Sequence, residues 1–459
     1  MKSGGLLVIF PAGEVSSLRL PAATICDPEW SETAVRLVGI TNALTVPVFF
    51  RGSNSPAFQF AGLLHPGLRT VLLPRELLNK RGRTLRVAVG SSITASSLSR
   101  HSTDREAADY LQWRTQLLQA RREEDSWMVS VFRDPFPFRG KRPPAKIIPA
   151  VNAEACRYEV ESLPDDQKLL EQGDHQVCFA NAGQIPQLLR EIGRLREVSF
   201  RQVGEGTGEP VDLDLFDTHY LHLFVWHKRR NEVAGAYRFA GTDEVLSRFG
   251  PQGLYTSTLF HFRHDFLSRV HPALELGRSF VRPEYQRSFA PLLLLWKGIG
   301  QYVARHPRYR ILFGPVSISD TYSPASRALI VSFLKERHFD SSLAPSVRAK
   351  HKYQTRPLRP MVANADELSD VVSDLEPDRK GLPVLLRQYL NVGGQILDFS
   401  VDRHFSGVLD GLIVVDLAKT NRRLIDKYLG TAGAGRFRQF HGIAPDVFKR
   451  SVSMLCPEQ

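Results

Sequence analysis

The chain has 459 residues, of which 42% are hydrophobic and 24% are charged. This composition excludes wholesale disorder and a collagen-like or coiled-coil architecture, and the length suits two or three domains. The longest unbroken apolar stretches, residues 292–296 and 412–415, are far shorter than the roughly 20 residues of a membrane-spanning helix. Four widely spaced cysteines argue against a disulfide scaffold or a zinc site and favour the cytoplasm.

The balance of charge is basic, with 60 Lys and Arg against 48 Asp and Glu and a net charge of +12. Such an excess attracts polyanions, namely nucleic acid, an anionic bilayer or an acidic carrier protein. Charge alone does not choose among these partners. A basic, solvated surface without a special partner also stays open.

The pattern of the N-terminal residues is typical of the interior of a domain. Leu6–Phe10 is an apolar run that predicts a buried strand, and a helix ending near residues 37–39 leads to a second apolar strand over residues 44–50. The expected order is strand, loop, helix and strand, which is typical of an α/β domain.

The segments Phe10-Pro11-Ala12-Gly13-Glu14-Val15-Ser16 and Val46-Pro47-Val48 resemble the third and fourth motifs of the 1-acylglycerol-3-phosphate acyltransferases. The resemblance implies that the acceptor-holding loop contains Phe10, Pro11, Gly13, Glu14 and Ser16. The family's His-x-x-x-x-Asp pair, which supplies the general base, does not occur before this loop, and Ala12 stands where the family usually has Glu. Loss of a general base costs a factor of roughly a hundred to ten thousand in rate. We therefore expect residues 1–100 to be a partial glycerolipid acyltransferase domain without O-acyltransferase activity.

The segment 101–153 is predicted to connect this lobe to the rest of the chain. It begins with a helix over residues 104–122 and continues with a stretch, residues 127–149, in which aromatic and basic residues alternate among prolines. This composition suits the interface of an anionic bilayer. An interdomain linker whose aromatics dock on one of the lobes is the alternative.

Regular patterns follow from residue 184. An amphipathic helix ends at the glycine cluster 204–208, which we interpret as a flexible turn, because a nucleotide-binding loop would follow a strand and open a helix. The later predicted elements are strands at 220–226, 233–239, 254–260, 273–281 and 311–316, with helices at 291–306 and 324–337. The predicted fold class is α/β, more narrowly α+β, with a mixed, mostly antiparallel sheet in the order of the GNAT acyltransferase fold.

The segments 275–279, 282–285 and 381–390 resemble the hemolysin-like branch of the GNAT family, which includes the ornithine-lipid N-acyltransferases and is similar in its core to the acyl-homoserine-lactone synthases. The expected GNAT domain covers residues 154–420, and residues 421–459 are expected to be a C-terminal tail. The whole chain resembles the bifunctional ornithine-lipid synthases. This implies transfer of a long, 3-hydroxylated acyl chain from acyl carrier protein to the α-amine of ornithine or a similar amino acid.

The donor is expected to be a 4'-phosphopantetheine thioester, with no tightly bound cofactor and no metal. The loop before the helix at 291 presents backbone N–H groups and the positive end of a helix dipole. We therefore expect the phosphate of the donor to bind at Gln286, Arg287 and Ser288. The loop has no glycine to wrap a pyrophosphate, which favours acyl carrier protein over coenzyme A. An ordinary strand-to-helix loop with a surface arginine is the alternative.

The candidate catalytic residues are Glu275 and Arg278. Glu275 is the expected general base for the amine, and Arg278 would orient the acceptor carboxylate or the acyl carbonyl. A bulge at Gly277 would place both side chains on one face of the strand, and a structural contact between them is the alternative. Ser317 and Ser319 could donate hydrogen bonds to an oxyanion or the leaving thiol, although such serines are common at strand ends.

Five histidines near the first three strands form no zinc-binding pattern, and we expect His222 to be structural. We expect an enzyme that works in the cytoplasm at the inner face of a membrane, with acyl carrier protein and an anionic membrane surface as partners and no nucleic acid. A second hypothesis is a non-enzymatic basic adaptor that binds membrane or nucleic acid.

Overall fold

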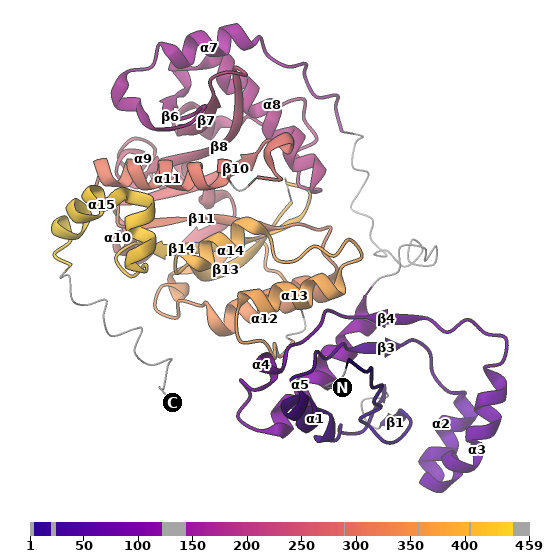
Figure 1. The fold of residues 1–459 in the computed structure, drawn as a ribbon. Helices are drawn as coiled ribbons and strands as arrows, with labels where there is room; N and C mark the ends of the chain where they lie inside the picture. The colour runs from indigo at the N-terminus through magenta and orange to yellow at the C-terminus, as the bar shows by residue number, and fades with distance from the viewer. Residues whose placement is uncertain are drawn as a thin grey trace. The chain divides into compact units, whose positions relative to one another are not determined.

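The computed structural model describes residues 4–19, 24–121, 144–288, 290–355, 358–403 and 405–443. The chain forms two compact units (Figure 1). The first unit consists of Met1–Val131, Ser323–Ile330 and Arg359–Leu382, and the second of Phe132–Tyr322, Val331–Leu358 and Pro383–Gln459. Most of the aromatic and basic stretch at 127–149 lies outside the described residues, and the predicted domain boundaries at 100, 153 and 420 stay predictions.

The first unit contains short strands and several helices. Its helices are α1 (Thr33–Thr41), α2 (Pro56–Leu64), α3 (Pro66–Asn79), α4 (Ala95–Leu98), α5 (Asp104–Leu117) and α13 (Ala365–Leu375). Its strands β1 (Ser17–Arg19) and β2 (Thr24–Cys26) form one antiparallel pair, and β3 (Val48–Phe50) and β4 (Val87–Val89) form another. The predicted helix at 104–122 is confirmed as α5, and its apolar face packs against α1 in a small core.

The prediction of a buried strand at residues 6–10 is wrong. These residues have no regular structure, and Leu6 and Phe10 are 94% and 70% exposed. An apolar run is buried only where another element covers it, and no strand of the described residues pairs with this one. The second predicted strand is confirmed only in its last part, as β3.

Residues far along the chain complete the first unit through a buried ion pair. Arg114 of α5 and Asp374 of α13 lie 2.8 Å apart, and both side chains are only 4% exposed. Asp374 also accepts hydrogen bonds from the backbone N–H and the hydroxyl of Ser91. These contacts attach the segment 359–382 to α5 and the strand region before it.

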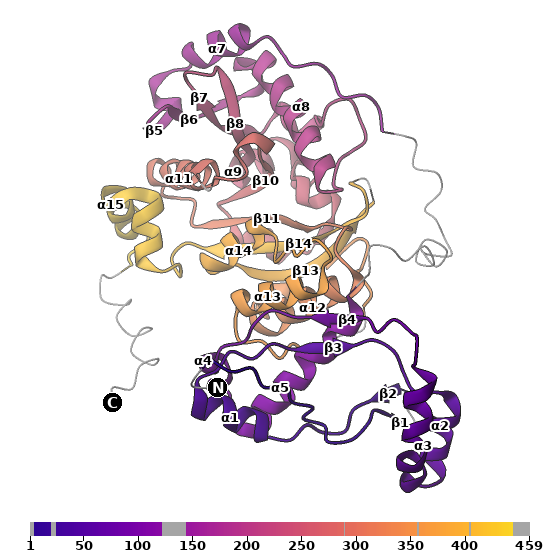
Figure 2. The same cartoon turned by 45° about the vertical axis from the view of Figure 1, so that its right-hand side comes forward.

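The second unit is built on an eight-stranded sheet with the order β13-β14-β11-β10-β8-β7-β6-β5. The strands are β5 (Lys168–Gln172), β6 (His175–Asn181), β7 (Leu221–His227), β8 (Glu232–Gly241), β10 (Ala273–Val281), β11 (Ile311–Ile318), β13 (Gln395–Asp402) and β14 (Val408–Asp416). Only β10 and β11 pair in parallel; the other neighbours in this sheet are antiparallel. Figure 2 shows β11, β14 and β13 side by side at one end of this sheet. The predicted fold class, a mixed and mostly antiparallel α/β sheet, is confirmed.

Helices cover both faces of this sheet. The helices α7 (Ala153–Glu161) and α8 (Pro186–Gln202) pack on one face against Phe224 and Ala236, and α11 (Ala290–Arg305) packs on the other, where Gly298 lies beside Val177 and Leu223. Because successive side chains of a strand point to opposite faces, Leu223 packs against α11 and Phe224 packs against α7 and α8. The remaining helices of this unit are α9 (Thr242–Phe249), α10 (His264–Val270) and α14 (Val384–Asn391), and α12 (Pro324–Arg337) has residues in both units.

Residues in the predicted C-terminal tail form a helix. α15 (Arg422–Phe440) crosses α11 closely, and a Cβ atom at Gly300 would lie 2.4 Å from the carbonyl oxygen of Tyr428. Glycine is therefore required at this crossing. Residues 444–459 lie outside the described residues.

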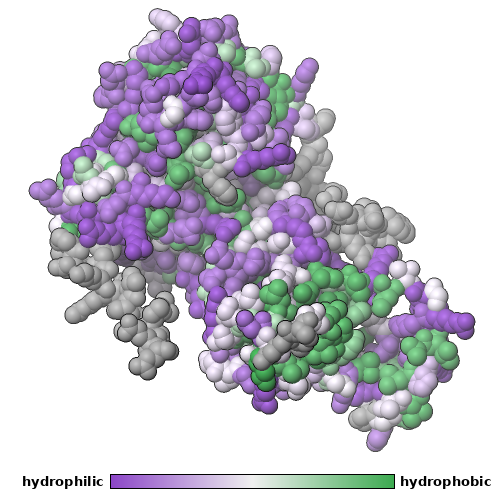
Figure 3. Space-filling view, viewed as in Figure 1, coloured by the Kyte–Doolittle hydropathy of each residue, from purple (hydrophilic) through white to green (hydrophobic). Residues whose placement is uncertain are grey.

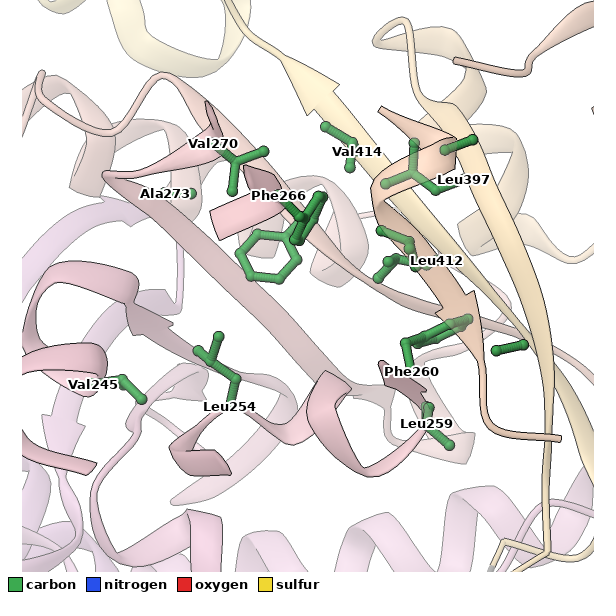
Figure 4. Packing of buried hydrophobic residues seen from close by; sticks show 14 of the residues in the cluster. Val245, Leu254, Leu259, Phe260, Phe266, Val270, Ala273, Leu397, Leu412 and Val414 are labelled. Atoms are coloured by element: carbon green, nitrogen blue, oxygen red, sulfur yellow. The ribbon is translucent and has the colours of Figure 1, made fainter. Parts of the chain in front are cut away.

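The predicted strand at 254–260 is wrong. Its residues form short 3-10 turns, Pro251–Gly253 and Tyr255–Thr258, and only then the strand β9 (Phe260–Phe262), which pairs with β12 (Val347–Ala349) outside the large sheet. Its apolar residues are buried in a cluster between the sheet, α9 and α10, where Leu254 and Phe260 are 0% and 1% exposed (Figure 4). A short buried turn and a buried strand share the same apolar pattern, so the pattern alone predicts a strand here.

Among the helices of the described residues, none combines the length and the apolar character needed to cross a membrane.

Candidate functional site

A band of charged side chains lies on the sheet between two hydrophobic clusters. On β8, Ala236 belongs to the cluster beneath α7 and α8, and Ala240 belongs to the cluster shown in Figure 4. Arg238 stands between them on the same face, because side chains two residues apart on a strand point the same way. It is 1% exposed, so the band is a buried polar layer that interrupts an apolar core.

The two parallel strands separate beside this band. β10 and β11 pair only over Ala273–Glu275 and Ile311–Phe313; beyond these residues β10 follows β8 and β11 follows β14. Where they part, a Cβ atom at Gly314 would lie 2.0 Å from the carbonyl oxygen of Leu276, so the close approach requires glycine. Side chains on the diverging segments can therefore face each other without a ladder of hydrogen bonds between them.

Glu275 lies at the last paired position of β10 and is 1% exposed. Its carboxylate accepts hydrogen bonds from the backbone N–H groups of Tyr255, at 3.1 Å, and Thr256, at 2.7 Å, and from the Tyr220 hydroxyl. Burial raises the pKa of Glu275, and these donors act against that rise. The carboxylate fixes the turn at 254–256, and three protein donors already occupy its oxygens.

Arg278 lies on the bulge that the sequence predicts. The register of β10 against β8 shifts between Gly277 and Phe280, and Arg278 has a left-handed φ of 48°. This conformation strains a residue other than glycine, and such residues gather at functional sites. Its guanidinium lies over the rings of Phe405, at 4.5 Å, and Tyr255, at 5.2 Å. Glu275 and Arg278 therefore both contact Tyr255, but no direct contact joins them.

Three aspartates upstream of β7 hold the arginines of the band. Asp212 and Asp214 lie 3.5 and 3.7 Å from the Arg278 guanidinium, and Asp214 also accepts a hydrogen bond from Arg238. Asp217 pairs with Arg196 at 2.7 Å and with Arg238 at 3.1 Å. Burial alone would raise the pKa of Asp217, but the two arginines lower it well below its usual range.

His222 lies beneath these ion pairs and is fully buried. Burial lowers its pKa to about 4, helped by Arg196, so the imidazole is neutral near pH 7. Its Nε2 lies 3.0 Å from the carbonyl oxygen of Asp217, which fits an N–H that donates to that oxygen. This arrangement agrees with a structural His222. Among the described residues, no group of His, Cys, Asp and Glu side chains is arranged to hold a metal ion.

A second set of carboxylates faces Arg278 from the other side of the separation. Glu205, in the glycine cluster 204–208, is 8% exposed and accepts a hydrogen bond of 2.8 Å from the Ser317 hydroxyl on β11. Burial raises the pKa of Glu205 to about 7, and Asp320 adds to the rise, while Ser317 and Arg278 act against it. Asp410, opposite Ser317 in the register of β14, is also buried, and its pKa is raised by burial and then by Asp402 and Glu205.

The glycine cluster is held in place by Glu197 of α8. The Glu197 carboxylate is 0% exposed and accepts hydrogen bonds from the hydroxyl and N–H of Thr207, the N–H of Gly208 and the guanidinium of Arg201. The cluster forms a turn, as the sequence predicts, and a buried carboxylate ties its backbone to α8. The turn is a fixed support for Glu205.

The predicted donor loop lies between β10 and α11. The Gln286 amide donates to the carbonyl oxygen of Val281, at 2.9 Å, and the Ser288 hydroxyl accepts from the N–H of Ala290, at 3.2 Å, so Ser288 caps the start of α11. Arg287 is exposed beside them. Phosphate binding by this loop stays a prediction.

The two predicted serines have protein partners. The Ser317 hydroxyl donates to Glu205, and the Ser319 hydroxyl donates to the carbonyl oxygen of Val203, at 2.5 Å, and accepts from the N–H of Thr321. Both serines thus attach the end of β11 to the turn that carries Glu205. Their donation to an oxyanion or a thiol stays a prediction.

The predicted acceptor loop of the N-terminal lobe belongs to the first unit. Phe10–Gly13 form a turn in which the N–H of Gly13 donates to the carbonyl oxygen of Phe10, and the Phe10 ring lies 6.1 Å from that of Phe50. Glu14 lies 3.9 Å from Arg69, and the Ser16 hydroxyl donates to Asp27. Pro11 accepts from the N–H of Ser31. These contacts describe a surface turn, and its acceptor role is untested.

Several residues of the site are absent from the sequence-based prediction. They are Glu205, Asp212, Asp214, Asp217, Arg238, Tyr255 and Asp410. One available signal is the spacing Asp-x-Asp-x-x-Asp over 212–217 just before a strand, which is an unusual concentration of carboxylates beside apolar residues. A second is an acidic residue between two glycines, because glycine permits close backbone approach at functional turns.

Comparison with known proteins identifies the family to which the chain belongs. Residues 195–297 match the family described as the acetyltransferase (GNAT) domain. The chain is 31% identical over 279 residues to an L-ornithine N(alpha)-acyltransferase of Brucella abortus, an alignment that covers 58% of this chain and 92% of that protein. The chain belongs to the GNAT N-acyltransferase family.

Two further relatives are named for a different acceptor, glycine. A glycine N(alpha)-acyltransferase of Bacteroides thetaiotaomicron is 36% identical over 208 residues, covering 42% of this chain and 60% of that protein, and one of Phocaeicola vulgatus is 33% identical over 207 residues, covering 42% and 62%. This GNAT chain thus spans about 60% of the length of those two relatives. No solved structure gives a significant match. The predicted membership of the GNAT family is confirmed; the acyltransferase activity of this chain and a fused glycerolipid acyltransferase domain stay predictions.

Proposed function

We propose that this chain is an N-acyltransferase that moves a long acyl group from a thioester to the α-amine of an amino acid. The observation that carries the proposal is the position of Glu205, whose pKa is about 7, beside Arg278 where β10 and β11 separate. A carboxylate that titrates near neutral pH suits the removal of a proton from an ammonium group. The names of the family members support an amino-acid acceptor, ornithine or glycine.

In the proposed reaction, Glu205 takes a proton from the acceptor's ammonium group. The free amine then attacks the thioester carbonyl, so that a carbon–nitrogen bond forms and the carbon–sulfur bond breaks. The second proton of the nitrogen passes to the departing thiolate, which leaves as a thiol, and Glu205 returns its proton to water. No oxidant, reductant or metal is needed for this balance.

Arg278 is proposed to hold the acceptor's carboxylate or the acyl carbonyl. Its Nε has no hydrogen-bond partner among the described residues, although the side chain is only 11% exposed. A buried donor without a partner is costly, and a ligand carboxylate would satisfy it through a charge-assisted hydrogen bond. Asp212 and Asp214, at 3.5 and 3.7 Å, hold the guanidinium by charge without saturating its hydrogen-bond donors.

Glu275 is retained as a candidate base, but its contacts fit a positioning residue better. Its oxygens are engaged by Tyr220, Tyr255 and Thr256, and Tyr255 in turn supports Arg278. A Glu275→Gln change would therefore move the 254–256 turn and the Tyr255 ring. Among the described residues, one hydrogen bond to the Glu205 carboxylate is seen, from Ser317, and Glu205 is more exposed than Glu275.

The proposed donor is a thioester of acyl carrier protein. The basic surface suits an acidic carrier, and the exposed Arg287 beside the N-terminus of α11 suits a single phosphate. The resemblance to ornithine-lipid synthases suggests a 3-hydroxyacyl chain. The product would be an aminolipid, so we also propose that the enzyme works on the cytoplasmic face of a membrane.

The test is an in vitro transfer assay with the purified chain. Acyl carrier protein and coenzyme A thioesters of the same 3-hydroxyacyl chain are each offered with ornithine, with glycine and with putrescine, which has amines but no carboxylate. The proposal expects amide formation with an amino acid and not with putrescine, and faster transfer from the carrier protein. Absence of amide product with every donor and amino acid, from a folded chain, would favour the non-enzymatic adaptor.

A further inference from the structure

The hairpin of α2 and α3 in the first unit presents apolar side chains to solvent along both helices. Leu64, Val71 and Leu77 are 83%, 75% and 76% exposed. The full set of exposed large apolar residues in and just after the hairpin is Phe60, Leu63, Leu64, Leu68, Val71, Leu73, Leu77, Leu78 and Leu85. Figure 3 shows apolar atoms gathered over the N-terminal unit, including α2 and α3. Exposed apolar side chains gathered in this way mark an interaction site.

The same segment is strongly basic. Residues 56–86 contain Arg69, Arg75, Lys80, Arg81, Arg83 and Arg86, and their only acidic residue is Glu76. Glu76 is 5% exposed and accepts hydrogen bonds from the N–H and the hydroxyl of Ser55, so its charge is turned inward. The outer surface of the hairpin therefore carries cations beside leucines.

The hairpin is a formed element, so its exposed leucines do not result from a frayed end. Ser55 caps α2 through the N–H of Phe58, and His65 caps α3 through the N–H of Gly67. The two helices approach closely, since a Cβ atom at Gly62 would lie 2.6 Å from the side chain of Arg69. The Ser55 to Glu76 hydrogen bonds join the beginning of α2 to the end of α3.

We propose that the α2–α3 hairpin docks on an anionic phospholipid bilayer. Leucines on short helices enter the boundary between headgroups and acyl chains, and Arg and Lys side chains bind the headgroup phosphates. The helices have 9 and 14 residues, whereas a helix needs roughly 20 residues to cross the hydrocarbon core of a bilayer. The hairpin would therefore lie in the interface. The combination of exposed leucines and an excess of positive charge favours an anionic lipid surface over a neutral protein partner.

This docking surface extends the proposed function by naming the residues that meet the membrane. It belongs to the first unit, while Glu205 and Arg278 belong to the second. A binding assay without donor and acceptor therefore tests the surface independently of acyl transfer.

The experiment is vesicle flotation of the full chain. Vesicles of phosphatidylcholine alone are compared with vesicles that also contain phosphatidylglycerol, at low and high salt. The apolar variant carries Leu64→Asn, Val71→Asn and Leu77→Asn, and the charge variant carries Arg75→Gln, Arg81→Gln and Arg83→Gln. A matched control changes exposed apolar residues of the second unit, Val384→Asn and Phe440→Asn, which are 55% and 59% exposed in the wild type.

The proposal expects the wild type and the control to bind the anionic vesicles and to lose binding at high salt. The charge variant should bind on the order of a hundredfold more weakly, because three basic residues near the surface account for about that factor. The apolar variant should also bind on the order of a hundredfold more weakly, because three apolar side chains no longer enter the boundary between headgroups and acyl chains. Circular dichroism melting checks that the variants fold, and transfer with short, soluble acyl thioesters checks that the second unit is intact.

Several results would overturn the proposal. One is wild-type binding by both hairpin variants, particularly if deletion of residues 133–146 removes binding instead. Another is equal binding to neutral and anionic vesicles, which would exclude the charge recognition. A third is a wild-type dimer that becomes monomeric in the hairpin variants while vesicle binding is unchanged, because a second copy of the chain would then cover the surface.

Discussion

The carboxylate of Glu205 and the hydroxyl of Ser317 lie 2.8 Å apart and join the turn after α8 to the diverging end of β11. The serine donates to the carboxylate and opposes part of the rise in its pKa that burial causes. The strand that leaves β10 thus supports Glu205, the proposed acid–base group. This contact connects the branch point of the sheet with the proposed chemistry.

The first prediction concerns the pH dependence of activity. Only ionised Glu205 can accept a proton, so kcat/KM should rise as pH increases through about 7. Glu205→Gln should lower kcat by a factor of roughly a hundred to ten thousand and remove this rise. Rates measured from pH 5.5 to 9 check it. A Glu205→Gln enzyme with the wild-type profile would exclude Glu205 as the base, and loss of the profile only in Glu275→Gln would restore Glu275.

The Glu205 carboxyl should also make the free energy of unfolding depend on pH. The folded pKa of Glu205, about 7, exceeds its ordinary value of 4.5, so the folded state binds the proton more tightly. The stabilisation that this tighter proton binding adds to the folded state is fully present below pH 4.5 and is lost as pH rises through about 7. Relative to wild type, Glu205→Gln should gain on the order of 3 kcal/mol between pH 4.5 and 8. Urea unfolding at both pH values measures this, and a pH-independent difference would contradict the assigned environment.

Arg278 offers two informative substitutions. Arg278→Met removes the partner of Asp212, which is 2% exposed, and should destabilise the chain by about 3–5 kcal/mol because a buried charge loses its counter-ion. Arg278→Lys keeps the charge but loses the planar group over Phe405 and Tyr255, so it should fold and raise KM for the amino acid more than it lowers kcat. Thermal melts and initial rates separate the two effects. Wild-type KM in Arg278→Lys would argue against acceptor binding by this residue.

Glu197 should act through the turn that it holds. Glu197→Ala removes the acceptor for Thr207 and Gly208, so Glu205 should lose its fixed position and kcat should fall. Because Glu197 does not touch the proposed reaction centre, the apparent pKa near 7 should shift toward the ordinary range as Glu205 becomes more exposed. The pH profile of the residual activity is the measurement. A reduced rate with an unshifted profile would indicate general destabilisation instead.

Gly314 tests the branch point of the sheet. Gly314→Ala places a Cβ atom against the backbone of Leu276, so it should destabilise the second unit by about 3 kcal/mol. The matched control is Gly435→Ala in α15, where a Cβ atom would meet nothing within 4 Å and where alanine should be neutral or stabilising. Chemical unfolding compares the two variants. Equal stability of both would contradict the close approach of β10 and β11.

The sequence predicts the second unit better than the first. Hydrophobic periodicity locates β7, β8, β10, α11, β11 and α12 within a few residues, because these elements alternate strongly or repeat at helical spacing. The preference of bulges for glycine points to Gly277, where the register of β10 begins to shift. It fails for Leu6–Phe10 and for residues 254–258, where apolar residues are exposed or are buried without pairing. Local patterns carry no information about which element covers an apolar run.

The candidate site is predicted only in part for a related reason. Glu275 and Arg278 lie on one strand, so their relation follows from strand geometry. Glu205 and Asp410 approach Arg278 from a turn and a distant strand, and only the tertiary fold brings them there. The raised pKa of Glu205 arises from burial, which the glycine-rich sequence around it does not indicate.

We propose that this chain joins an acyl group to the nitrogen of an amino acid with Glu205 as the proton acceptor. Lipid mass spectrometry of a host that expresses the chain, grown with ¹⁵N-labelled ornithine or glycine, tests it most directly. The account predicts a labelled amide-linked lipid in the wild-type strain and its loss in a Glu205→Gln strain with equal protein level. A labelled lipid at wild-type abundance in that variant would contradict the role of Glu205, and the absence of any amide-linked lipid from the wild type would contradict the activity itself.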